Sequence, residues 1–142
     1  MHVRAILDEK GRDVLTIRPD ATLHEATRIL AENRIGALMV LGVNQQIKGI
    51  LSERDIVRVI AKSGADALNA TVSSVMTANV VRCTEDSSLD EVMAMMTAKR
   101  FRHVPVEANG KLVGMISIGD VVKSRIREIE FEAEEIKAYI AG

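Results

Sequence analysis

Apolar positions along this chain follow the same order of patterns twice. In the first half, residues 13–17 are predicted to form a strand and residues 35–43 are an apolar run of strand length, and between them apolar residues recur at the three- and four-residue spacing of a helix. A third strand is predicted at 47–51 and a second helix at 52–61. The order strand, helix, strand, strand, helix predicts an α/β fold, with a small sheet packed against helices.

The second half of the chain repeats the first. Leu89 stands 66 positions after Leu23, and the turn Gly49-Ile-Leu-Ser-Glu-Arg-Asp55 is matched in outline by Gly114-Met-Ile-Ser-Ile-Gly-Asp120. Two copies of about 60 residues are too few for an open solenoid. We therefore expect a closed pair related by a pseudo-two-fold axis, with a cleft on that axis.

Each copy carries a hydroxyl and a carboxylate three residues apart, where a strand turns into a helix. These pairs are Ser52 with Asp55 and Ser117 with Asp120. Free backbone N–H groups and the positive end of the helix dipole suit a phosphate, and the carboxylate is left to accept hydrogen bonds from a vicinal diol such as ribose. The alternative is that both serines only cap their helices, which is worth about 1 kcal/mol each.

Composition narrows the class of partner. The chain has 142 residues and a formal net charge of −1, so no bulk field draws it to nucleic acid or to an anionic membrane. Aromatic residues make up only 2%, so the chain has few of the aromatic side chains on which a protein that binds single-stranded nucleic acid stacks the bases. The longest apolar run, 35–43, is too short to span a membrane, no secretory segment is visible, and the single cysteine fits a reducing compartment. We expect a cytoplasmic protein.

Three segments resemble the motifs of the CBS family, named after cystathionine beta-synthase. They are residues 49–55, the sequence Arg-His-Val-Pro-Val at 102–106, and residues 114–120. The likeness covers nearly the whole chain, and it is to stand-alone proteins made of a pair of CBS motifs, such as small two-motif proteins of bacteria and plant organelles. It implies a module that binds an adenine nucleotide in the cleft between its motifs.

The resemblance also implies which residues line each pocket. It places the aspartate on the ribose hydroxyls, the serine near the phosphate, aliphatic side chains against the base and basic side chains against the phosphates. The first pocket then combines Ser52, Arg54, Asp55, Ile50, Val80, Val81, Arg102 and His103. The second combines Ser117, Asp120, Met115, Val14, Leu15 and Ala37.

The two pockets are expected to differ in charge. Arg102 and His103 have the uncharged counterparts Gly36 and Ala37, 66 positions earlier, and the counterpart of Arg54 is a glycine. We therefore expect the first pocket to take a charged phosphate tail. The second is expected to stay empty or to take a less charged adenosine compound. The alternative for Arg102 and His103 is a solvated basic edge.

A small polar connector at 62–71 divides the chain. We assign residues 1–70 to the first motif, with its N-terminal cap and the connector, and residues 71–142 to the second motif with an extended C-terminal helix. That helix is predicted at 121–140, and its apolar stripe is too long for a small domain to cover. We expect the stripe to join two chains in a homodimer, rather than to fold back on its own domain.

The predicted function is sensing. An adenine nucleotide bridges the two motifs and changes the geometry of the module or its affinity for a regulated protein. AMP, ATP, an NAD-type dinucleotide and S-adenosylmethionine all remain open as ligands. The alternative is a ligand-independent scaffold that regulates a separate enzyme or redox partner. No catalytic residue pair, phosphate-binding glycine loop or metal-ligand set is visible, so we expect no enzyme, no catalytic cofactor and no metal.

Overall fold

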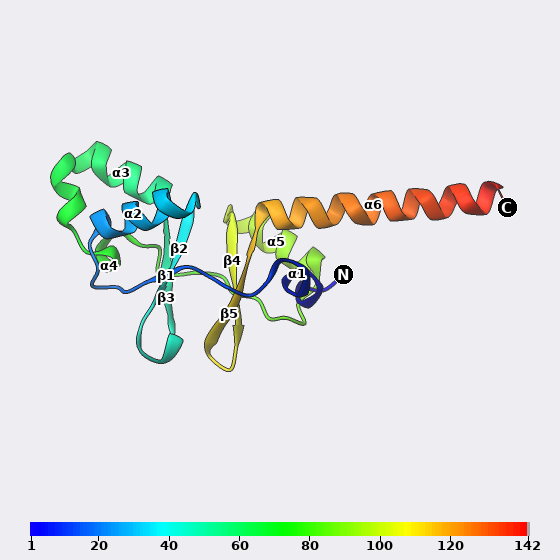
Figure 1. The fold of residues 1–142 in the computed structure, drawn as a ribbon, viewed down its shortest axis with the longest axis horizontal. Coiled ribbons are helices and arrows are strands. Elements are labelled where there is room, and N and C mark those ends of the chain that lie inside the picture. The colour runs from blue at the N-terminus through cyan, green and yellow to red at the C-terminus, as the bar shows by residue number, and fades with distance from the viewer. Residues whose placement is uncertain (142) are drawn as a thin grey trace.

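The computed structural model describes residues 1–141 and contains two small α/β units. The units lie side by side along the long axis of the molecule, and one long helix extends from the second unit away from the first (Figure 1). This arrangement confirms the predicted fold class.

The first unit is a three-stranded sheet with two helices. Strand β1 (Thr16–Ile17) pairs in parallel with β2 (Ala37–Leu41), and β2 pairs antiparallel with β3 (Ile47–Ser52). Helix α2 (Leu23–Asn33) connects β1 to β2, and α3 (Glu53–Ser63) follows β3. The first four residues of β2 are all buried, as expected for a strand that is covered on both faces.

The second unit repeats this plan. Helix α5 (Leu89–Lys99) precedes the antiparallel hairpin of β4 (His103–Ala108) and β5 (Lys111–Ser117). Helix α6 (Ile118–Ala141) follows β5 directly and begins three residues before its predicted start. The turn from β5 into α6 is therefore equivalent to the turn from β3 into α3.

Equivalent positions make the internal symmetry explicit. Cys83 bridges in parallel to Val106 as Ile17 pairs with Val40, at an offset of 66 residues. Both hairpins are irregular at the same step, directly after Val40 and after Val106. Helices α2 and α5 both end on an arginine in the left-handed conformation.

Two short helices are exchanged between the units. Helix α1 (Val3–Lys10) packs in the core of the second unit, where Val3 and Leu7 are fully buried. Helix α4 (Val72–Val75) packs in the core of the first unit, where Val72 is fully buried. The cap that the sequence assigns to the first motif therefore covers the second unit. The division at residue 70 stays a prediction.

Short irregular segments complete the chain. The 3-10 helix η1 (Val43–Gln45) links β2 to β3, and η2 (Ala65–Asn69) lies in the predicted connector. The predicted strand at 13–17 is paired only over β1, and residues 80–83, at the equivalent place in the second half of the chain, form a single bridge at Cys83. Both runs lie where the chain crosses from one unit to the other, which limits the length over which they follow a neighbouring strand (Figure 1).

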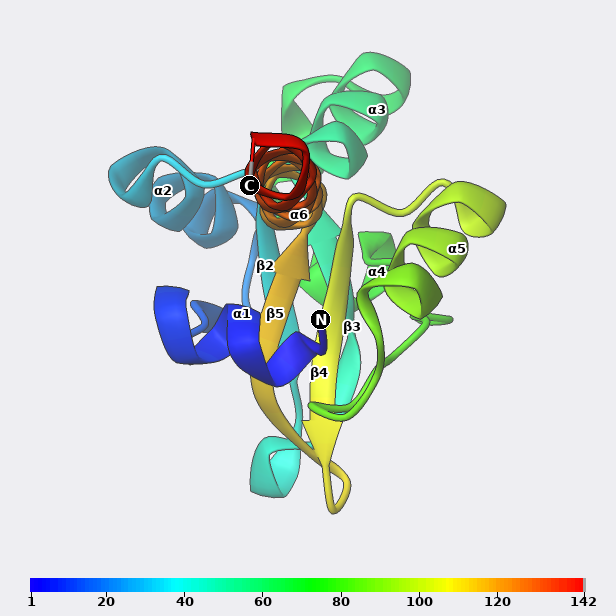
Figure 2. The same cartoon turned by 90° about the vertical axis from the view of Figure 1, so that its right-hand side faces the viewer.

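The two sheets stand face to face with an apolar layer between them (Figure 2). Met39, Ile47 and Ile50 of the first sheet pack there with Leu112 and Met115 of the second. Ile50 and Met115, which are equivalent residues, also line two separate surface cavities. The layer therefore joins the units and supports both candidate pockets.

Candidate functional site

The two Ser–Asp corners form matching helix caps. The backbone N–H of Ser52 donates to Asp55 Oδ2 at 2.9 Å, and the backbone N–H of Asp55 donates to Ser52 Oγ at 3.2 Å. Ser117 and Asp120 repeat this geometry at 2.8 Å and 3.2 Å. The capping role is therefore present in both copies. Within residues 1–141, Oδ1 of neither aspartate accepts a hydrogen bond, so each corner keeps a carboxylate oxygen for a ligand.

The first corner opens into a cavity of about 280 Å³. The first unit contributes Ile50, Ser52 and Asp55, and the second contributes Arg102 and His103 at the start of β4. The structure thus brings together residues that were predicted for one pocket although they lie far apart in the sequence. Because both units line the cavity, a molecule bound in it contacts both.

The first cavity is strongly cationic. Its lining holds two carboxylates, Glu53 and Asp55, and a larger number of basic side chains. Among the residues that the structure describes, none of these basic side chains forms an ion pair within 4.0 Å. Like charges gathered around one hollow repel one another and attract an anion. The five cations are Arg54, Arg58, Lys99, Arg100 and Arg102.

The second corner lies beside a cavity of similar size, about 270 Å³. Met115 and Ser117 of the second unit line it together with Val14, Leu15 and Ala37 of the first. These five residues were predicted to lie together. The other charged or titratable groups in its lining are one lysine, one aspartate and His103, so this cavity lacks the excess of cations found in the first.

Asp120 is the exception among the predicted residues of the second pocket. Lys10 Nζ donates to Asp120 Oδ2 at 2.6 Å and to the carbonyl oxygen of Met115 at 2.8 Å. Lys10 lines the second cavity, whereas Asp120 lines a neighbouring hollow of about 160 Å³ that Lys10 also lines. Asp120 is thus not part of the described lining of the second cavity, because the ion pair with Lys10 holds its carboxylate, and its role in ligand binding stays a prediction.

The ion pair also sets the protonation state of Asp120. Burial alone would raise the pKa of this carboxyl group. The hydrogen bonds from Lys10 and from the backbone N–H of Ser117 act in the other direction and outweigh it, so the pKa lies below its ordinary value. Asp120 is thus held as a carboxylate that is already paired.

The first corner has no such lysine. Met76 stands 66 positions after Lys10 and carries no charge. Asp55 Oδ2 accepts its second hydrogen bond from Ser52 Oγ, at 3.0 Å. The two corners therefore share their backbone geometry but differ in whether a cation occupies the carboxylate.

His103 lines both cavities. Burial lowers the pKa of its imidazole, and the positive charges of Lys10 and Arg102 lower it further, against the opposing effect of Asp120. The imidazole is therefore neutral at pH 7 and has one N–H to donate.

Two of the predicted pocket residues lie elsewhere. Val80 packs in the layer between the sheets and Val81 packs against the core of the second unit. Among the described residues, neither is part of the lining of the first cavity. Sequence reasoning missed Arg58, Lys99 and Arg100, although the basic run Lys-Arg-Phe-Arg-His at 99–103 was a visible signal for two of them.

Other candidate chemistry is limited. Burial, with a smaller contribution from the charge of Glu91, raises the pKa of the Cys83 thiol to about 11. The buried thiol packs in the core of the second unit. Within residues 1–141, no three His, Cys, Asp or Glu side chains are grouped to hold a metal ion. No helix in that range is both long and apolar enough to cross a membrane.

The fold and the paired corners define a class of protein: a tandem of two pseudo-symmetric α/β motifs with cavities between them. The family model described as the CBS domain matches residues 3–62 and 72–127. The chain belongs to this family, with two CBS motifs, and the predicted family is confirmed.

Individual relatives agree with this assignment. A CBS-domain containing protein from Agrobacterium tumefaciens has a structure with a TM-score of 0.84 and 50% identity, over 88% of this chain and 99% of that one. The mitochondrial CBS domain-containing protein CBSX3 of Arabidopsis thaliana is 32% identical over 96% of this chain and 70% of its own length. A structure of the CBS domain pair of protein MJ0100, in complex with 5′-methylthioadenosine and S-adenosyl-L-methionine, has a TM-score of 0.76 and 25% identity, over 87% of this chain and 98% of that one.

Proposed function

We propose that this chain is a regulatory module that binds an adenine nucleotide in the first cavity. The observation that carries the proposal is the set of five cations around the Ser52–Asp55 corner, none of them in an ion pair within residues 1–141. Phosphate groups relieve the repulsion among these cations through charge-assisted hydrogen bonds. The free Oδ1 of Asp55 accepts hydrogen bonds from a ribose diol. AMP, ATP and an NAD-type dinucleotide all combine these two groups.

The adenosine part of the proposal has support from a relative. The CBS pair of protein MJ0100 is in complex with 5′-methylthioadenosine and S-adenosyl-L-methionine, both adenosine compounds. The proposal that the ligand carries phosphate is supported by this chain itself, through the cations that line the first cavity. We place the base against Ile50, the aliphatic side chain that lines this cavity beside the corner.

The second cavity is proposed to take a different ligand from the first, or none, in line with its different charge. Lys10 holds the carboxylate of Asp120, so the ribose of a ligand has to compete with an ammonium group 2.6 Å away. The surroundings of Ser117 also lack the cations that favour a phosphate tail. We propose that this cavity stays empty or takes a less charged adenosine compound, with Val14, Leu15, Ala37 and Met115 around the base.

Titration calorimetry with AMP tests the proposal on a matched pair of variants, Asp55→Ala and Asp120→Ala. Both lose a helix-capping carboxylate, worth about 1 kcal/mol each, and Asp120→Ala also loses the ion pair with Lys10, so it should lose more folding stability than Asp55→Ala. Only Asp55→Ala should lose hydrogen bonds to the ligand, worth roughly 1.5 to 3 kcal/mol, or about ten-fold to over a hundred-fold in affinity. Equal losses of affinity would contradict the difference between the sites, and a wild-type protein that binds no AMP would contradict the function.

A bound nucleotide would act by touching both units, because the corner belongs to the first and the segment 99–103 to the second. Such a ligand favours the relative geometry in which both sets of contacts are made, and a regulated protein responds to that geometry. Stand-alone CBS pairs are in general regulatory modules without catalytic activity. A ligand-independent scaffold is the second candidate, since both aspartates already serve as helix caps. The cytoplasmic location stays a prediction.

We also propose that two chains associate. Val57 on α3 and its equivalent Val122 on α6 are exposed by 65% and 51%. Because these two side chains occupy equivalent places on the two units, one contact surface on a second copy can cover both.

A further inference from the structure

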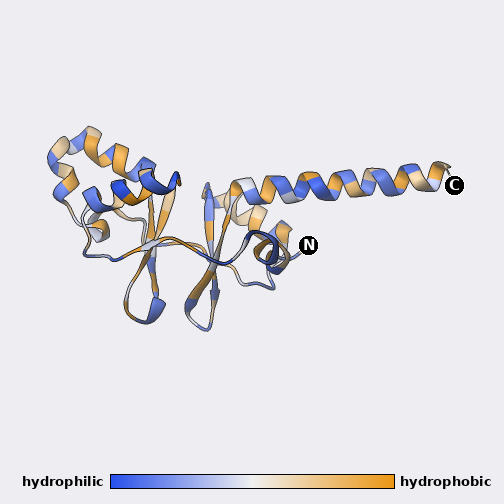
Figure 3. Cartoon of the chain, in the orientation of Figure 1, coloured by the Kyte–Doolittle hydropathy of each residue, from blue (hydrophilic) through white to orange (hydrophobic). Residues whose placement is uncertain are grey.

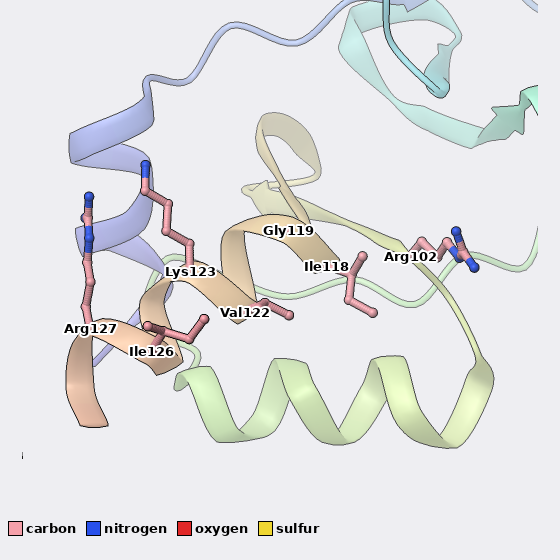
Figure 4. A pocket seen from close by; sticks show the side chains of 7 residues that line it. All are labelled: Arg102, Ile118, Gly119, Val122, Lys123, Ile126 and Arg127. Atoms are coloured by element: carbon pink, nitrogen blue, oxygen red, sulfur yellow. The ribbon is translucent and has the colours of Figure 1, made fainter. Parts of the chain in front are cut away.

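An apolar stripe continues along α6 beyond the body of the molecule. Figure 4 shows its beginning, where Ile118, Val122 and Ile126 project from one side of the helix and Lys123 and Arg127 project toward α1. Figure 3 shows apolar segments recurring to the end of the helix. The stripe recurs at alternating steps of four and three residues, which are the d and a positions of a heptad repeat. Its members are Val122, Ile126, Ile129, Ala133, Ile136 and Ile140.

Nothing in the described part of the chain covers this stripe. The exposed fraction of its large side chains runs from 50% at Ile126 to 78% at Ile140. Phe131 is also exposed, by 64%, but lies outside the stripe on the far side of the helix. The family match ends at residue 127, so most of the exposed stripe lies beyond the CBS motifs.

The charged residues beside the stripe distinguish a parallel from an antiparallel arrangement with a second copy of this helix. In a parallel helix pair, each g position contacts the e position five residues later on the other helix. Arg125 would then meet Glu130 of a second copy, and Glu132 would meet Lys137. Each attractive contact occurs twice by symmetry. The e positions are Lys123, Glu130 and Lys137, and the g positions are Arg125, Glu132 and Tyr139.

An antiparallel pair with the whole stripe in contact has the opposite result. Such a pair brings e beside e and g beside g. Lys123 would then lie opposite Lys137, Glu130 opposite Glu130, and Glu132 opposite Glu132. All of these contacts are between like charges, which are destabilising.

We propose that α6 forms a parallel two-stranded coiled coil with α6 of a second copy of this chain. This inference deepens the proposed homodimer and does not depend on nucleotide binding. The stripe is one seam wide, with charged residues at both of its borders except at Tyr139. A helix in a two-stranded coil needs one such seam, whereas a helix in a three-stranded coil contacts two neighbours and needs a wider apolar face.

The parallel pairing of the two α6 helices determines how the two chains are oriented relative to each other. The start of α6 is anchored to its own chain by Arg127 to Glu9 at 2.6 Å and by the buried side chains of Val121 and Ser124. The helix runs along the long axis of the molecule, away from the first unit (Figure 1). A parallel pair therefore sets the two-fold axis along this direction and places the first unit of one chain beside the first unit of the other.

Sedimentation equilibrium of the full chain tests the association. We expect a dimer, and we expect the double variant Ile129→Asp/Ile136→Asp to weaken it at least 100-fold, because both aspartates lie in the seam. Phe131→Asp is the control, with one aspartate introduced on the outer side of the same helix, and should leave the mass of the dimer unchanged. Thermal unfolding checks that the bodies stay folded. A wild-type monomer or trimer, or a double variant that remains dimeric, would overturn the proposal.

Oxidative cross-linking tests the orientation. Ile136→Cys places the two thiols opposite each other in a parallel pair, whereas in the antiparallel pair residue 136 lies opposite residue 126. We expect rapid disulfide formation in Ile136→Cys and none in the outward-facing control Phe131→Cys. The natural Cys83 is buried and does not interfere. Equal rates in the two variants would contradict the parallel coil.

Discussion

At the scale of single residues, Lys10 is the clearest difference between the two cavities. Its ammonium group forms an ion pair with the carboxylate of Asp120, to which a ribose would otherwise donate hydrogen bonds. Its counterpart Met76 is uncharged. We expect Lys10→Met to free Asp120 and to raise the number of adenosine molecules bound per chain by one, as measured by titration calorimetry. The reverse variant, Met76→Lys, should weaken binding at the first corner about ten-fold. Unchanged stoichiometry in Lys10→Met would show that Lys10 does not close the second site.

His103 gives a prediction of pH dependence. Its pKa is lowered in the folded protein, first by burial and then by Lys10 and Arg102. The unfolded chain therefore takes up a proton first as the pH falls through about 6.5, and the free energy of unfolding should decrease below that pH. Urea denaturation at pH 7.5 and 5.5 measures this change, and the window lies above the range in which Asp120 titrates. His103→Gln should reduce the difference, and an equal slope in the variant would assign it to other groups.

The sequence predicted the site unevenly, for a physical reason. The Ser52–Asp55 corner was predictable because a strand, a cap and a helix are local features that four residues can specify. The pairing of Lys10 with Asp120 joins residues that are distant in sequence, and no local pattern predicts such a contact. Val80 was assigned to a pocket by analogy, whereas here its side chain is used to pack the layer between the sheets.

At the scale of elements, two glycines allow segments to approach each other. A Cβ added at Gly49 would lie 2.6 Å from the carbonyl oxygen of Thr77, and one at Gly114 would lie 2.8 Å from the methyl carbons of Leu7. The Thr77 backbone is held by paired hydrogen bonds with Ile50 at 3.0 and 2.9 Å, whereas a leucine side chain can rotate.

We therefore expect Gly49→Ala to destabilise the protein more than Gly114→Ala. Overpacking typically costs about 1–3 kcal/mol, and Gly49→Ala should lie at the upper end of this range. Urea denaturation of the two variants against the wild type measures the difference. Two alanine variants of equal stability would contradict the assumption that the backbone at Thr77 is the more rigid neighbour.

The exchange of α1 and α4 belongs to this scale too. Val3 and Leu7 have the spacing of an apolar helix face, and this spacing predicts that the helix is buried. It contains no information about which of two similar cores receives the face. The order of the elements was predictable from the repeat, but the partner of each short helix depends on contacts across the whole chain.

At the scale of the whole molecule, the first cavity connects two units that also share an apolar layer and the crossing segments. A ligand on the Ser52–Asp55 corner and on the segment 99–103 therefore adds contacts between the units. The sequence predicted this bridging role from the duplication, because a closed pair of repeats necessarily places its cleft between them. It could not predict the excess of cations in one cleft, since Arg58 and Arg100 reach the same hollow from different units.

A nucleotide that bridges the two units should stabilise the protein, and this effect distinguishes a sensor from a scaffold. AMP at 100 times its dissociation constant should add about 2.7 kcal/mol to the free energy of unfolding, which a thermal shift detects. Because the ligand contacts both units, hydrogen exchange should slow in β3 and in β4 together, and not around one corner alone. Asp55→Ala at the same AMP concentration is the control and should lose most of both effects. If AMP at saturating concentration changes neither the melting temperature nor exchange in either unit, the cavities take no part in regulation and the chain acts through its surfaces alone.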